Sequence, residues 1–177
     1  LPSSDESNMS FDRAGKTFIA TLKRGGPFGR SHRIWTSRNF TEWTDTGVLF
    51  HADELDQQLA KKNIDARLSN PKLQQPVKTV PADYNADIYN FGVFRYEGLY
   101  IGMPAVYHAT GRLKANTDGF HLIQLACSRN LKKWTRLGGR QPFIGPSPVG
   151  PDVFDRTQLL PPSAPVEHSD ELWFYYT

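Results

Sequence analysis

One eight-residue sequence occurs twice in the chain: Ser37-Arg38-Asn39-Phe40-Thr41-Glu42-Trp43-Thr44 returns as Ser128-Arg129-Asn130-Leu131-Lys132-Lys133-Trp134-Thr135. Five of the eight positions are identical, and the fourth position is apolar in both copies. Repetition of this kind is typical of folds that are built from copies of one supersecondary unit. The sequence therefore predicts that one structural unit is used twice.

Strand and turn signals around each copy complete the unit. Upstream of each copy, a polar turn joins two apolar runs, at 11–22 and at 95–106, as in a β-hairpin. A third hairpin is expected at 166–176, preceded by a proline-containing inner strand. The strands expected in the two units are 8–12, 17–23, 32–37 and 43–50, and then 89–95, 99–108, 120–128 and 134–144.

The apolar pattern of the second unit indicates stacked sheets. Its strands at 99–108 and 120–127 have apolar side chains on both alternating faces, so both faces are expected to be covered. Repeated four-stranded antiparallel sheets that need a neighbour on each face are typical of a β-propeller. We therefore predict an all-β chain with one short helical insertion. Its expected parts are a first blade at 1–50, the insertion at 51–86, a second blade at 87–144 and the start of a third at 145–177.

The length of the chain leaves two architectures open. Propellers close with roughly 4–8 blades, whereas 177 residues hold two units and one further hairpin. The chain is therefore expected to be part of a propeller, and the alternative is a small β-sandwich that is complete at this length.

Composition excludes several classes of function. Lysine and arginine exceed aspartate and glutamate by only three and are dispersed, which gives no case for nucleic acid. No apolar run approaches the ~20 residues of a membrane helix, and the start of the chain lacks the features of a signal peptide, so no membrane partner is expected and the compartment stays open. Neither a metal-ligand cluster nor a phosphate or dinucleotide loop occurs, so no metal or cofactor is expected.

The repeated element Ser-x-Asn-(Phe/Leu)-x-x-Trp resembles the Ser-x-Asp-Leu-x-x-Trp turn of five-bladed glycosidase propellers, the class that contains invertases, levanases, arabinanases and xylosidases. The stretches 87–100 and 170–176 look like blade openings of uncharacterised bacterial proteins related to those enzymes. The resemblance implies a partial five-bladed β-propeller and a furanosidase-type glycoside hydrolase. Such an enzyme would bind carbohydrate in the central funnel and hydrolyse it with paired carboxylates.

Blade topology places the candidate site on one rim. In an antiparallel blade the first strand is innermost. The loop that enters this strand and the loop that joins the second and third strands lie on one rim of the propeller. The repeated turns, which join the third and fourth strands, lie on the opposite rim. Carboxylates occur at every entry, and those predicted to be catalytic are Glu6, Asp5, Asp87 and Asp155. Residues predicted to bind the substrate are Asn8, Arg30, Asn90, His108 and Arg112. The alternative for any one of these acids is an ordinary loop residue that accepts hydrogen bonds from the backbone.

Two further segments are expected near the same rim. The glycine-rich loop at 23–31 carries Lys23, Arg24 and Arg30, which predicts an acidic or sulfated carbohydrate. The alternative is that these cations are solvated or pair with acids of the 51–86 insertion. A helix at 52–62, with Leu55 and Leu59 on one face, is interpreted as a lid, as protection for a sheet edge or as an oligomer contact.

Two rivals to the hydrolase remain open at this point. One is a propeller that binds carbohydrate without hydrolysing it, and the other is a scaffold that binds protein across one rim.

Overall fold

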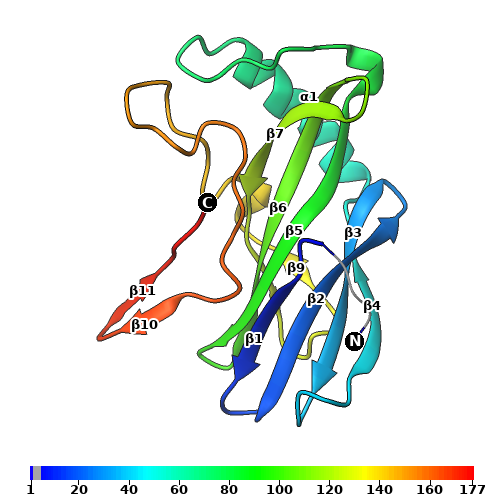
Figure 1. Ribbon diagram of the computed structural model, residues 1–177, viewed down its shortest axis with the longest axis vertical. Coiled ribbons are helices and arrows are strands. Elements are labelled where there is room, and N and C mark those ends of the chain that lie inside the picture. Colours follow the sequence, from blue (N-terminus) through cyan, green and yellow to red (C-terminus); the bar gives the residue numbers. More distant parts are fainter. Residues whose placement is uncertain (2–4) are drawn as a thin grey trace.

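The computed structural model describes Leu1 and residues 5–177, and its elements are mostly strands, with 44% strand and 12% helix (Figure 1). The first sheet is antiparallel, with the order β1-β2-β3-β4. Its strands are β1 (Asn8–Asp12), β2 (Thr17–Gly26), β3 (Gly29–Ser37) and β4 (Thr44–Phe50). The four expected strands of the first unit are confirmed, and the central hairpin extends further into its glycine-rich loop than predicted.

The second sheet begins with the same strand order but breaks its third strand. Its strands are β5 (Asn85–Tyr96), β6 (Leu99–Arg112), β7 (Thr117–Ile123), β8 (Ala126–Ser128) and β9 (Thr135–Arg136). Both β7 and β8 pair with β6, so the continuous strand expected at 120–128 is interrupted.

The fourth strand of this sheet is much shorter than the expected 134–144. After β9 the chain enters the 3-10 helix η2 (Gly138–Arg140), in which all three residues have positive φ. Strand geometry requires negative φ, so the chain turns away from the sheet. It returns only at Ile144, which forms an isolated bridge with Ile123.

The third hairpin is confirmed as a two-stranded sheet of β10 (Val166–His168) and β11 (Glu171–Trp173). It projects at the lower left of Figure 1. A proline-containing inner strand was expected before this hairpin. In the described structure, the segment 161–165 forms no strand.

The two copies of the repeat fold into the same turn, as predicted. In each, the Asn side chain accepts hydrogen bonds from the backbone N–H groups two and three residues later, and the indole N–H donates to the carbonyl of the residue three positions earlier. Phe40 and Leu131, at equivalent positions, both have positive φ, at 65° and 61°. The repeated residues thus specify local backbone geometry.

The insertion forms the helix α1 (Glu54–Leu68), which is longer than expected, followed by the 3-10 helix η1 (Pro81–Asp83). Asp53 and Asp56 form a capping box at the start of α1. Leu55, on the apolar face noted in the sequence, is exposed. The buried residues of α1 are Asp56, Ala60, Ile64 and Arg67.

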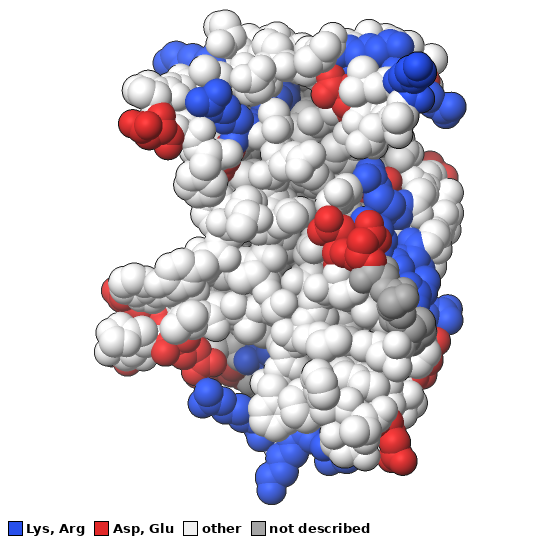
Figure 2. All heavy atoms as spheres, viewed as in Figure 1, with Lys and Arg blue, Asp and Glu red and all other residues white. Residues whose placement is uncertain are grey.

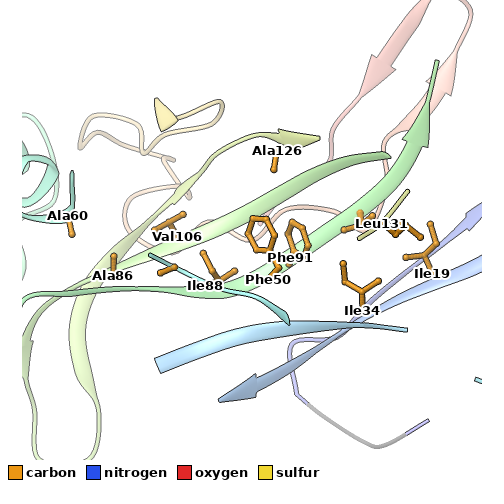
Figure 3. Packing of buried hydrophobic residues seen from close by; sticks show 12 residues of the cluster. Ile19, Ile34, Phe50, Ala60, Ala86, Ile88, Phe91, Val106, Ala126 and Leu131 are labelled. Atoms are coloured by element: carbon orange, nitrogen blue, oxygen red, sulfur yellow. The ribbon is translucent and has the colours of Figure 1, made fainter. Parts of the chain in front are cut away.

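The main core lies between the two sheets (Figure 3). Ile19 and Ile34 come from the first sheet and face residues of β5 and β6. Phe50 at the end of β4 stacks on Phe91 of β5, with ring centroids 4.1 Å apart. This packing holds the start of β5 beside the β2–β3 hairpin, which positions the candidate site.

Candidate functional site

A pocket of about 650 Å³ lies where the β2–β3 loop meets the start of β5. The residues that line it are Asp5, Lys23, Arg24, Gly25, Gly26, Gly29, Arg30, Asp87, Asn116 and Thr117. The structure thus brings together the three cations of the basic loop and two of the four predicted acids. Figure 2 shows basic and acidic side chains next to one another on the side of the molecule occupied by the first sheet.

Arg30 and Asp87 form the central ion pair of this pocket. Arg30 Nε donates to Asp87 Oδ2 at 2.8 Å, and the backbone N–H of Arg30 donates to the same oxygen at 3.3 Å. The other carboxylate oxygen, Oδ1, is buried and has no hydrogen-bond partner among the residues described. Burial raises the pKa of Asp87, and the hydrogen bonds and charge of Arg30 oppose this rise. Of the two carboxyl groups in the pocket, Asp87 is therefore the one whose pKa lies above that of a free aspartate.

Asp5 has the opposite electrostatic environment. Its carboxylate accepts a hydrogen bond from Lys23 Nζ at 3.0 Å, and its side chain is exposed. This hydrogen bond and the positive charge of Lys23 lower the pKa of Asp5. One pocket therefore holds a buried carboxyl group whose pKa is raised and an exposed one whose pKa is lowered.

Two aromatic rings hold Arg30 in place. Its guanidinium carbon lies 4.6 Å from the ring centroid of Tyr89 and 4.5 Å from that of Tyr107. Lys23 also lies over Tyr89, at 4.6 Å. Cation–π contacts of this kind restrict where a charged side chain can sit. Arg30 is therefore held by its ion pair and by both tyrosines.

Glu6, Asn8 and Asn90 belong to a hydrogen-bond network next to the pocket but do not line it. Asn8 Nδ2 donates to Asn90 Oδ1 at 2.5 Å, and Asn90 Nδ2 donates to Glu6 at 3.3 Å. Ser163 donates to Asn8 Oδ1 at 3.0 Å and accepts a bond from the backbone N–H of Met9. The network ties β1, β5 and the segment before β10 together, so these predicted residues have a structural role in this arrangement.

Asp155 lies elsewhere. It accepts hydrogen bonds from the hydroxyl groups of Ser147 at 2.8 Å and Tyr176 at 2.9 Å, and it is not among the residues that line the pocket. Burial acts to raise the pKa of Asp155, but the two hydroxyl donors outweigh it and lower the pKa. These contacts anchor the loop before β10 to the end of the chain, and they correct the expectation that Asp155 shares the cavity of Asp87.

His108 and Arg112 also lie away from the pocket. His108 is buried and stacks on Phe120, with ring centroids 4.9 Å apart. Its Nδ1 lies 3.1 Å from the carbonyl oxygen of Val106, and its Nε2 lies 3.1 Å from Asn63 Nδ2. Burial lowers the pKa of His108 to about 4, so the ring is neutral.

Arg112 is exposed and pairs with Asp83 at 3.5 Å. Neither residue therefore contacts a ligand bound beside Arg30 in this arrangement.

Sequence reasoning missed Tyr107 and His121, which flank Arg30 and Asp87. Asp87 on β5 pairs with Tyr107 on β6, and Tyr107 pairs with His121 on β7, so the three share one face of the sheet. Both ring nitrogens of His121 are buried and lack a hydrogen-bond partner within the described chain. Burial and the charge of Arg30 lower its pKa to about 3. The alternation of side chains along a strand could have placed Asp87, Tyr107 and His121 on one face of the sheet, but only if the pairing register of β5, β6 and β7 had been known.

A second cavity, of about 810 Å³, lies at the opposite ends of the same strands. It is bounded by the β1–β2 turn, the β5–β6 turn and residues 164–167, and it contains none of the predicted site residues. Among Leu1 and residues 5–177, no group of three metal-binding side chains occurs. No helix in the same residues is long and apolar enough to cross a membrane.

Comparison of the chain with protein-family models, with curated proteins and with solved structures finds no match.

Proposed function

We propose that this chain is part of a five-bladed, glycosidase-like β-propeller, and that its pocket binds a carbohydrate and hydrolyses it. The proposed general acid is Asp87, and the proposed ionised partner is Asp5. The observation that carries the proposal is the single pocket in which these two carboxyl groups have pKa values shifted in opposite directions.

The architecture supports the first part of this proposal. Two antiparallel sheets begin with the same strand order, carry the same turn at the same strand boundary and pack with a shared apolar core between them. Stacked blades of a propeller have this relationship. The β10–β11 hairpin is then the start of a third blade.

The chemistry of glycoside hydrolysis supports the second part. The reaction requires one carboxyl group that is protonated and donates to the leaving oxygen, and one that is ionised and acts as nucleophile or base. Environments that move the pKa values of two acids apart assign these roles. In this pocket, burial moves the pKa of Asp87 upwards and Lys23 moves that of Asp5 downwards.

An amide substitution tests the assignment. Asp87→Asn keeps the shape of the side chain but cannot donate a proton as an acid, so hydrolysis should fall by roughly 100-fold or more. Asp45→Asn is the matched control, because Asp45 also pairs with an arginine of β3 but lies outside the pocket. The measurement is release of reducing ends from neutral and acidic oligosaccharides, with both variants checked for thermal stability. Equal turnover by Asp87→Asn and the unchanged chain would remove Asp87 from the mechanism.

The second candidate function is carbohydrate binding without hydrolysis. The observation that favours it is the 2.8 Å ion pair between Arg30 and Asp87 Oδ2. Within the described chain, Oδ2 is the only oxygen of Asp87 that has a hydrogen-bond partner, and that partner is a cation, which favours the ionised carboxylate. Saccharide binding by the unchanged protein, with no turnover on any oligosaccharide in the panel, would select this function over the hydrolase.

A further inference from the structure

We propose that the saccharide bound in this pocket is anionic, and that its carboxylate or sulfate group is held by the terminal nitrogens of Arg30 with help from Arg24 and Lys23. This inference rests on the proposed function, since it names the class of carbohydrate bound at the same site.

The charges that line the pocket do not balance. Its lining contains three cations, Lys23, Arg24 and Arg30, and two carboxylates, Asp5 and Asp87. Lys23 pairs with Asp5 and Arg30 pairs with Asp87. Arg24 donates to the carbonyl oxygen of Lys23 and pairs with no carboxylate in the part of the chain that the structure describes. Arg24 is therefore the cation of the lining that has no acidic partner among the described residues, whether Asp87 is ionised or protonated.

Arg30 presents hydrogen-bond donors that the protein does not use. Its Nε and its backbone N–H bind Asp87, whereas Nη1 and Nη2 make no hydrogen bond to any residue described. The ion pair and the two tyrosine rings already fix the orientation of the guanidinium group. A guanidinium held in this way can bind a carboxylate or sulfate through two parallel hydrogen bonds and loses little conformational entropy on doing so.

The loop backbone brings these cations close to the ligand space. A Cβ atom built at Gly29 would lie 2.9 Å from Asp87 Oδ2, and the φ of Gly29 is +115°, so glycine allows the loop to close onto the carboxylate. A Cβ atom at Gly25 would have no neighbour within 4 Å, which leaves the backbone open on that side. A ligand can therefore approach the loop between the two arginines.

The stability of the fold gives little reason for the exposed pair of Lys23 and Asp5 in this cluster. Exposed ion pairs contribute little to stability because water screens them, and the side chain of Asp5 in the pair with Lys23 is largely exposed. The expected alternative, pairing of the basic loop with acids of the 51–86 insertion, is not what the structure has, since the described partners are Asp5 and Asp87. Solvation by water is the alternative role for these cations, and the binding experiment below distinguishes it from a ligand anion.

Matched pairs of saccharides test the inference by calorimetry on the full chain. One pair is trigalacturonic acid and its methyl ester, and the other is a 6-O-sulfated disaccharide and the same disaccharide without sulfate. One arm tests carboxylate and the other tests sulfate as the anionic group. At low salt, the charged member of at least one pair should bind about tenfold more tightly than its neutral counterpart, the difference expected for one charge-assisted contact.

Substitutions then locate the contact. Arg30→Gln should abolish the preference for the charged member, and Arg24→Gln should reduce it without disturbing the buried Asp87. Arg33→Gln is the control, because Arg33 lies on the same strand but pairs with Asp45 outside the pocket. If Arg30→Gln fails to fold, the result for Arg24→Gln decides between the outcomes.

The outcomes separate this inference from the proposed function. Equal affinity for charged and neutral members, unchanged in the Arg24 and Arg30 variants, would overturn the inference and leave carbohydrate binding intact. Failure of every saccharide to bind would overturn both. A preference that Arg33→Gln removes as fully as Arg30→Gln would show a general charge effect and would also overturn the assignment to the pocket.

Discussion

At the scale of single residues, Gly29 and Gly25 form a matched pair in the same hairpin. Gly29→Ala should destabilise the chain by about 1–3 kcal/mol, because the new Cβ would contact Asp87 and alanine is strained at positive φ. Gly25→Ala should change stability by less than about 1 kcal/mol, since its Cβ would meet nothing. Urea denaturation of both variants checks this. Equal effects of the two substitutions would show that the contact with Asp87 does not matter.

At the scale of elements, the two repeated turns separate local geometry from packing. Trp43 and Trp134 make the same indole hydrogen bond, but Trp134 packs against Phe50 and Phe91 in the main core, at ring distances of 5.8 and 5.3 Å. Trp43 contacts Phe40 near the surface. Trp134→Ala should therefore cost about 3 kcal/mol and Trp43→Ala about 1 kcal/mol. Denaturation midpoints measure the difference, and a larger loss from Trp43→Ala would contradict it.

The helix α1 is joined to the second sheet by a buried charge cluster. Asp56 pairs with Arg136 at 3.0 Å and with Arg140 at 2.9 Å, and its side chain is 1% exposed. Asp56→Ala would leave the largely buried Arg136 without its acidic partner, whereas Arg140 would keep its pair with Asp53, and the change should cost about 3 kcal/mol. Asp65→Ala, which removes an exposed pair with Lys61 on the same helix, should cost much less, because water screens both partners. Thermal unfolding compares the two, and similar losses would show that the cluster adds no stability.

At the scale of the whole molecule, three buried histidines set the pH dependence of stability. Burial lowers the pKa of His32 to about 4, of His108 to about 4 and of His121 to about 3. In the unfolded chain their pKa is near 6.5, so the unfolded state takes up protons first as the pH falls. Stability should be fully present above pH ~6.5 and decline towards pH ~4, by about 2 kcal/mol per histidine between pH 7 and pH 5.

One substitution checks this origin of the pH dependence. His121→Phe places an apolar ring between Tyr89 and Tyr107 and should remove roughly a third of the loss between pH 7 and pH 5. The raised pKa of Asp87 offsets part of the loss in every variant. Acids with lowered pKa values, such as Asp53 at about 2, lose their contribution only at lower pH. Melting temperatures between pH 4.5 and pH 8 measure the slope, and an unchanged slope in His121→Phe would assign it to other groups.

Local structure in this protein follows from residues that are close together in the sequence. The repeated Ser, Asn and Trp residues specify a turn through bonds within seven residues, so both turns and the strands of the first unit were predictable. The same holds for the basic, glycine-rich loop, whose extended hairpin brings its cations to one end of the sheet.

Contacts between side chains that are distant in the sequence depend on how the two sheets and the helix pack. Asp87, Tyr107 and His121 share a face because of strand register, which depends on long-range pairing and on bulges in β5 and β6 that no local signal specified. The same long-range packing placed Asp155 beside Tyr176, buried His108 against Phe120 and turned the Asp56 face of α1 inwards. A residue's type limits the chemistry that it can perform, but its neighbours across the fold decide whether that chemistry is used.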